Sequence, residues 1–172
     1  MSSVNISESA LQVLLDKQEI TEVLTRYCRA IDRLDEELLR SVYWPDGYDD
    51  HMSFAGSVSE FIPEAIKSCA SLFTSTVHSI SNILIEVDGD TARSETYFTS
   101  FNRLSERRDG RQYDRITCAR YIDRLERRNG EWRIARRLVV TDWNRVDPVG
   151  ESEVWGKAVG LRSREDPVYR NA

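Results

Sequence analysis

Hydrophobic residues in the first part of the chain recur at the three- and four-residue steps of amphipathic helices. One such stripe covers about residues 7–31 and predicts a long first helix. Asp35 can cap a second, short helix that runs to about residue 43, where the turn sequence at 45–47 ends it. Helical spacing returns over about residues 58–73 and predicts a third helix with a serine cap.

The pattern changes after residue 76 to segments rich in β-branched and aromatic residues, separated by turn dipeptides of the Asp-Gly and Asn-Gly type. These segments predict four strands joined as hairpins, at about 77–87, 91–105, 112–127 and 131–143. The last three exceed the usual strand length, so the sheet must twist or bend, with bulges as the natural means. We therefore expect an α+β fold in which N-terminal helices pack on a strongly curved antiparallel sheet and enclose a pocket.

A compositional break divides the chain into two parts. Glycine, proline and charged residues interrupt the periodicity after about residue 145, so we expect one domain over residues 1–145 and a tail over 146–172. Trp155, Val159 and Leu161 are too apolar for a free linker. The tail is therefore expected to dock on its own or a neighbouring subunit, with a short helix possible near 151–158.

Composition excludes several classes of protein. The 172 residues carry 24 Lys and Arg against 29 Asp and Glu, a net charge of −5, which disfavours nucleic acid as a partner. No apolar run reaches the length of a membrane span, and the N-terminus lacks the features of a signal peptide. We expect a soluble, cytoplasmic protein without a membrane partner.

Motifs for cofactors and metals are also missing from the sequence. The three cysteines are widely spaced, which suggests neither a disulfide framework nor a zinc site. No glycine-rich nucleotide loop, P-loop or serine-hydrolase elbow occurs. Asp49, Asp50 and His51 are metal-ligand types, but three adjacent residues cannot all face one ion. We predict no metal site and no cofactor.

His78 and Asp32 are the most promising chemical groups. Alternation along its strand places His78 on one face with Ile80, so its imidazole is either a hydrogen-bonded core group or a site base. Asp32 extends the helical stripe of Leu24 and Cys28 into a carboxylate, which either caps the following turn or partners another buried group. If Asp32 accepts a hydrogen bond from one nitrogen of His78, the other nitrogen can take a proton from a substrate.

Tyr27 and an arginine of the last strand could complete such a site. The Tyr27 hydroxyl could polarise a substrate oxygen, although a tyrosine on an apolar helix face is commonly core packing. Alternation sends either Arg136 or Arg137 inward unless a bulge intervenes, and spacing alone does not choose between them. Candidate aromatic residues for the pocket wall are Tyr43, Trp44, Tyr48, Phe54, Phe73, Phe98 and Trp143.

Short segments in a specific order give the chain a family resemblance over about residues 9–145. They are residues 15–20 and 27–35, Trp44-Pro45-Asp46-Gly47, Thr76-Val77-His78 with Asn82, Val87-Asp88-Gly89-Asp90 and Gly130-Glu131-Trp132-Arg133-Ile134. Together they resemble the SnoaL-like branch of the NTF2-like superfamily. The resemblance implies a cone-shaped fold with a deep pocket, as in scytalone dehydratase, bile acid 7α-dehydratase and hexachlorocyclohexane dehydrochlorinase.

The resemblance also implies roles for individual residues. His78 and Asp32 match the histidine base and aspartate partner of the family, Tyr27 matches a tyrosine of the bile acid enzyme, and Arg137 matches a dehydrochlorinase arginine near the leaving group. The dehydrochlorinase has a lysine-type residue where this chain has Tyr27, and the bile acid enzyme's late arginine falls near Thr141, so neither enzyme's substrate transfers to this chain.

These observations predict a cofactor-independent lyase of the dehydratase type, or an isomerase, that acts on a small apolar, aromatic or steroid-like molecule. Two alternatives stay open, because a fold does not determine a function. One is a non-catalytic subunit like the small subunit of ring-hydroxylating dioxygenases, and the other is a protein that only binds a hydrophobic metabolite. A homo-oligomer, dimer or trimer, is expected in each case.

Overall fold

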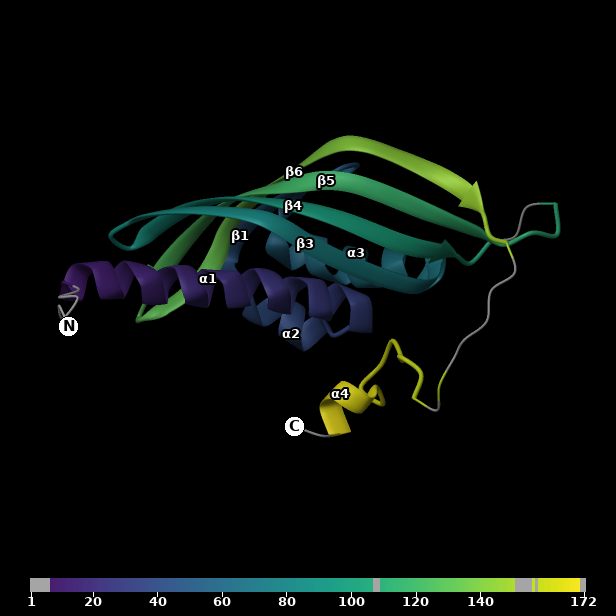
Figure 1. Cartoon of the computed structure of the whole chain (residues 1–172), viewed down its shortest axis with the longest axis horizontal. Coiled ribbons are helices and arrows are strands. Elements are labelled where there is room, and N and C mark those ends of the chain that lie inside the picture. Colours follow the sequence, from purple (N-terminus) through teal and green to yellow (C-terminus); the bar gives the residue numbers. More distant parts are fainter. Residues whose placement is uncertain (1–6, 107–108, 151–155, 157, 171–172) are drawn as a thin grey trace, which may run out of the picture.

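The computed structural model describes residues 7–106, 109–150, 156 and 158–170, and it shows helices packed against one face of a curved sheet (Figure 1). Helix α1 (Glu8–Arg33) begins at Ser7, whose side chain accepts a hydrogen bond from the Ala10 amide at 3.2 Å. It ends at Leu34, which has a left-handed φ of 54°.

The two shorter helices begin at the polar residues expected to cap them. The Asp35 side chain accepts from the Leu38 amide and starts α2 (Glu36–Ser41). Helix α3 (Val58–Leu72) starts after Ser57, where a Glu60 carboxylate oxygen accepts from the Ser57 amide and hydroxyl. The predictions of three helices are therefore confirmed in position and order.

The sheet has six strands in the order β2-β1-β6-β5-β4-β3. The four predicted strands are confirmed as an antiparallel series, β3 (Phe73–Asp88), β4 (Thr91–Leu104), β5 (Tyr113–Arg128) and β6 (Glu131–Pro148). The sequence did not predict β1 (Tyr43–His51) and β2 (Phe54–Ser57), and β1 lies parallel to β6. The sheet is thus antiparallel for the most part, with one parallel pair.

The turn sequence at 45–47 was expected to end a helix, but it lies inside β1. Pairing between β1 and β6 shifts register between Tyr43 and Tyr48, so the irregular stretch absorbs Pro45 without a regular ladder bond. A Cβ atom on Gly47 would lie 2.8 Å from the Trp44 carbonyl oxygen, so the close approach of the backbone requires glycine here.

Bulges bend the long strands, as their length predicted. Register shifts occur at Asn82 in β3, next to Ala119 in β5, and at Ala135 in β6, and Asn82 has a positive φ of 47°. The concave face of the bent sheet packs on α1 and α3 through a core that includes Ile20, Leu24, Ile62, Leu125 and Ile134.

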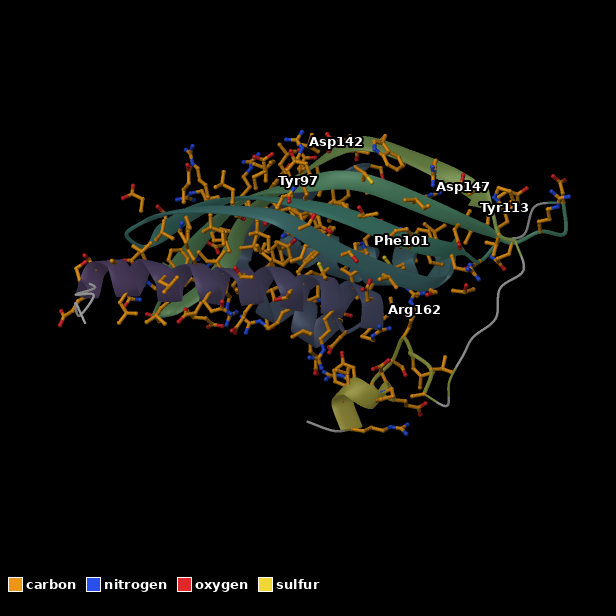
Figure 2. The ribbon with its side chains drawn as sticks, in the orientation of Figure 1. Tyr97, Phe101, Tyr113, Asp142, Asp147 and Arg162 are labelled. Atoms are coloured by element: carbon orange, nitrogen blue, oxygen red, sulfur yellow. The ribbon has the colours of Figure 1, made fainter. Side chains whose placement is uncertain are left out.

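The outer face of the sheet carries exposed aromatic residues. Tyr97 and Phe101 alternate on β4 with inward-facing residues, and their side chains project from the sheet (Figure 2). Such residues suit contact with a second molecule. The expected self-association stays a prediction, which light scattering after size-exclusion chromatography tests.

The described part of the C-terminal segment contacts the helices on their side away from the sheet (Figure 1). The hydroxyl of Tyr169, in α4 (Pro167–Arg170), donates to Asp35 at 2.7 Å. Arg162 donates to the carbonyl oxygens of Cys69 and Phe73, where α3 meets β3 (Figure 2). The helix expected near 151–158 lies largely outside the described residues.

Within the described ranges, no helix combines the length and the apolar character that crossing a membrane requires.

Candidate active site

Asp32 and His78 form a hydrogen-bonded pair between the last turn of α1 and the first part of β3. Asp32 Oδ1 lies 2.7 Å from His78 Nδ1, and Oδ2 accepts the His78 backbone amide at 2.9 Å. The carboxylate is 7% exposed, at the end of the apolar helical stripe. Both of its oxygens therefore act on one residue of the neighbouring strand.

This two-point contact assigns the protons of the dyad. Because an ionised carboxylate only accepts, the short contact places a proton on His78 Nδ1 and leaves Nε2 as the basic nitrogen. The amide bond to Oδ2 fixes the carboxylate relative to the strand that carries the imidazole. Asp32 can thus orient the ring and stabilise the imidazolium that forms when Nε2 takes a proton.

His78 lines a cavity of about 290 Å³ between the helices and the concave face of the sheet. The volume is at the lower end of the range typical of small-molecule sites. Most of its wall is apolar and aromatic, contributed by Ile31, Phe54, Phe61, Ala65, Cys69, Leu72, Phe73 and Phe98. Polar and charged groups also face it, namely Tyr27, His51, Glu64, Ser68, Ser100, Asn102, Arg115 and Thr117.

Tyr27 reaches the cavity from α1, one turn before Asp32 and next to the buried rings of Tyr43 and Tyr121. Burial raises the pKa of the Tyr27 hydroxyl well above its usual range. The group therefore stays protonated at any working pH and can donate a hydrogen bond to a substrate oxygen.

Arg137 is fully buried but does not line the cavity. Its guanidinium donates two hydrogen bonds to Asp123, at 2.8 and 2.7 Å, and lies 4.0 Å from the ring centroid of Tyr27 and 3.9 Å from that of Tyr121. The structure thus separates Arg137 from the dyad and places it behind Tyr27. It can act on a substrate only through Tyr27, as a positioning residue.

The bulge at Ala135 determines which arginine faces inward. Pairing passes from Ile134 directly to Arg136, so Ile134 and Arg137 both point to the core. Arg136 faces outward, with its guanidinium 4.9 Å from the ring centroid of Tyr48. Alternation without the bulge would have placed Ile134 and Arg136 on one face.

Three of the seven aromatic candidates line the cavity: Phe54, Phe73 and Phe98. The other four do not. Tyr43 is buried behind Tyr27, and the Trp44 indole donates to the Glu126 carbonyl oxygen with arginines over its ring. Tyr48 and Trp143 are exposed at 36% and 48%, next to Arg136 and Arg145.

Sequence reasoning missed a polar group on the sheet beside His78. Ser100 is the direct pairing partner of His78 on β4, Asn102 donates to the Ser100 hydroxyl at 3.0 Å, and Thr117 of β5 pairs with Ser100. All three line the cavity. Period-two alternation from Phe98 would have placed Ser100 and Asn102 on the inward face.

Sequence comparison identifies the family. The model of the SnoaL-like domain matches residues 12–138, so the chain belongs to the SnoaL-like family. The match falls inside the predicted domain of residues 1–145, whose boundary stays a prediction. A relative, the uncharacterized protein Rv2910c of Mycobacterium tuberculosis, is 31% identical over 126 residues, which cover 72% of this chain and 83% of that protein.

Solved structures with this fold include enzymes of more than one class. Hexachlorocyclohexane dehydrochlorinase LinA-type3 from Novosphingobium barchaimii matches with a TM-score of 0.71 and 17% identity, over 86% of this chain and 99% of that one. A protein assigned as a scytalone dehydratase from Novosphingobium aromaticivorans matches with a TM-score of 0.69 and 21% identity, over 81% of this chain and 97% of that one.

Another protein from Novosphingobium aromaticivorans, assigned as an aromatic ring hydroxylase, matches with a TM-score of 0.69 and 16% identity, over 79% of this chain and 94% of that one. At these identities the three matches show the fold, and they leave the chemistry to be argued from the site.

Proposed function

We propose that this protein is a cofactor-independent lyase of the dehydratase type, or an isomerase, that removes a proton from carbon in a small, mostly apolar cyclic molecule. The observation that carries the proposal is the Asp32–His78 pair at the wall of an apolar cavity. A base held by a buried carboxylate next to an apolar binding space suits abstraction of a weakly acidic C–H proton.

The polar groups around the cavity can take different roles in the reaction. His78 Nε2 takes the proton, and Asp32 stabilises the resulting imidazolium. The Tyr27 hydroxyl and the Asn102 amide are donors that line the same cavity, and they can stabilise negative charge that develops on a substrate oxygen. Arg137 holds the Tyr27 ring in place from behind.

Cavity size narrows the substrate class. A volume of about 290 Å³ suits a molecule of one or two rings better than a complete steroid. Phe54, Phe73 and Phe98 offer apolar contact for such rings.

A second candidate is a non-catalytic subunit, like the small subunit of ring-hydroxylating dioxygenases, or a binding module, and the fold shared with a protein assigned as an aromatic ring hydroxylase is compatible with it. In that case the cavity would hold a ligand or stay unused, and the dyad would serve stability. The two functions differ in whether His78 is needed for chemistry on a bound molecule.

Hydrogen exchange on a ketone separates the two functions. The bicyclic ketone 2-tetralone carries acidic C–H groups, and its exchange in D₂O is followed by NMR with the protein and with its variants. We expect acceleration by the protein, and a loss of about 10²-fold or more in His78→Ala, the low end for a missing general base. Asp50→Asn, a change at a half-buried residue that does not line the cavity, serves as the control.

Exchange that is unchanged in His78→Ala contradicts proton abstraction by this residue. If 2-tetralone binds to both proteins with equal affinity and neither accelerates exchange, the binding function is the better account.

A further inference from the structure

A second histidine–aspartate pair, which the proposed function does not use, has its histidine in the wall of the same cavity. Asp49 in β1 is fully buried, and its Oδ2 accepts the Tyr43 hydroxyl at 2.5 Å. Its other oxygen, Oδ1, lies 3.3 Å from Nδ1 of His51. Both atoms are buried, and within the described ranges neither has a partner with hydrogen-bond geometry, so the 3.3 Å contact between them is an ion-pair distance and not a formed hydrogen bond.

The His51 ring has contacts on its face, with Phe61, and at its edge, with Asp49. It stacks on Phe61 of α3 with a centroid distance of 5.4 Å and an interplanar angle of 25°. Nδ1 is next to the buried carboxylate, so Nε2 is the nitrogen available to a ligand, and His51 lines the cavity. Because a carboxylate without a full set of donors is costly to bury, Asp49 favours a proton on Nδ1.

Curvature of the sheet brings the two histidines to one cavity. β1 is the second strand from one edge, and β3 forms the other edge, so His51 and His78 come from nearly opposite ends of the sheet. Two imidazoles that reach one substrate from different strands can serve different atoms of it. One can accept a proton from carbon while the other donates a proton elsewhere.

We infer that His51 is a second catalytic residue, the general acid that protonates an oxygen leaving group, and that the substrate is a β-oxygenated carbonyl compound. The inference rests on the proposed function. His78 takes the proton from the carbon next to the carbonyl, and the electron pair of that C–H bond forms the new C=C bond. The C–O bond breaks, its pair stays on oxygen, and the proton of the His51 imidazolium joins that oxygen to give water or an alcohol.

The proton balance of this elimination closes within the site. His78 ends as the imidazolium next to Asp32, and His51 ends neutral next to Asp49, and exchange with solvent restores both. Hydroxide and alkoxide leave slowly without a proton, so a general acid is needed for oxygen leaving groups and not for a stable anion.

Two probes that differ only in the leaving group test the role of His51. 4-Phenoxy-2-butanone releases a phenoxide that gains from protonation, and 4-(4-nitrophenoxy)-2-butanone releases a stable nitrophenolate. We expect His51→Gln to lower the ratio of kcat/KM for the first probe over the second by about 10²-fold or more, the low end for a general acid. Asp49→Asn should lower the ratio in the same direction, and the neighbouring Asp50→Asn should leave it unchanged.

The pattern of losses separates this inference from the proposed function. A ratio unchanged in His51→Gln overturns the acid role while leaving proton abstraction intact. Loss of both activities in His78→Ala supports the proposed function, whereas both activities intact in His78→Ala overturn it, and with it the inference.

A measurement without a substrate tests the same residue. Nitrogen-15 NMR at a pH where His51 is neutral should show its remaining proton on Nδ1, and Asp49→Asn should change that tautomer while Asp50→Asn should not. A neutral His51 whose proton lies on Nε2, or a tautomer indifferent to Asp49→Asn, overturns the inference.

Discussion

Asp32 binds His78 through both carboxylate oxygens, one on the imidazole Nδ1 at 2.7 Å and one on the backbone amide at 2.9 Å. The second bond ties the carboxylate to the strand, so a rotation of the imidazole cannot carry Asp32 with it. An arrangement of this kind preorganises a base, because its partner is in place before the proton moves.

Replacement of Tyr27 by Phe tests the proposed hydroxyl donor. We expect kcat for a ketone probe to fall by about 10²-fold while KM changes little, because the donor acts mainly on developing charge. Tyr121→Phe is a matched control, because its hydroxyl is buried, lacks a partner among the described groups and does not line the cavity. An equal loss in both variants would show that packing, and not the Tyr27 hydroxyl, explains the effect.

The buried Arg137–Asp123 pair predicts a large and specific loss of stability. Arg137→Met leaves the Asp123 carboxylate buried without its cation, which costs about 3–5 kcal/mol. The double variant Arg137→Met/Asp123→Leu should recover much of that free energy of unfolding in urea melts. If the two single losses simply add in the double variant, the pair is not coupled as the geometry indicates.

The cysteines report on access to the cavity. Burial raises the pKa of Cys28 to about 12 and also raises that of Cys69, but only Cys69 lines the cavity. We expect iodoacetamide to spare Cys28 in the folded protein, and a bound ketone to slow alkylation of Cys69. Cys118 lies on the outer face beside Thr99 and serves as the internal control. Protection of Cys118 and not of Cys69 would place the ligand outside the cavity.

Asp166 predicts how docking of the C-terminal segment depends on pH. Hydrogen bonds from the Val168 and Leu161 amides lower the pKa of this carboxyl. The ionised Asp166 carboxylate therefore stabilises the docked segment. This contribution is fully present above about pH 4, the ordinary pKa of an aspartate, and it is lost as the pH falls through the lowered pKa of the docked state.

Two measurements follow from that sign. Backbone NMR signals of residues 158–170 should stay those of the docked segment from pH 7 to about 5 and change below about 4. Asp166→Asn should speed tryptic cleavage after Arg162 at pH 7, relative to cleavage after Arg170. Cleavage at an unchanged rate would show that other contacts, such as those of Arg162 with Cys69 and Phe73, hold the segment.

Periodicity alone was enough for the main helices and the four long strands, and it drew attention to Asp32 and His78 while leaving their pairing conditional until the family resemblance was considered. The reason is that a carboxylate at the end of an apolar stripe and an inward histidine on a strand are both local patterns. The first two strands were missed because Pro45 and Gly47 lie inside β1, whose pairing depends on a distant strand. Arg137 could not be chosen over Arg136, since a one-residue bulge at Ala135 decides the orientation.

The wall of the cavity was the least predictable part of the site. Phe98 and Tyr43 are both aromatic residues. In the structure Phe98 faces the cavity, whereas Tyr43 packs behind Tyr27. His51 was considered only as a metal-ligand type beside Asp49 and Asp50, because only the tertiary fold shows that it faces the cavity while Asp49 is buried.

The most direct measurement of the central claim is nitrogen-15 NMR of the two imidazoles in the wild-type protein and in Asp32→Asn. The signal that disappears in His78→Ala should show a proton on Nδ1, and the fraction of this tautomer should fall in Asp32→Asn, because a neutral amide no longer requires a donor at that position. A His78 whose tautomer is the same in Asp32→Asn would contradict the dyad as a proton-abstracting unit.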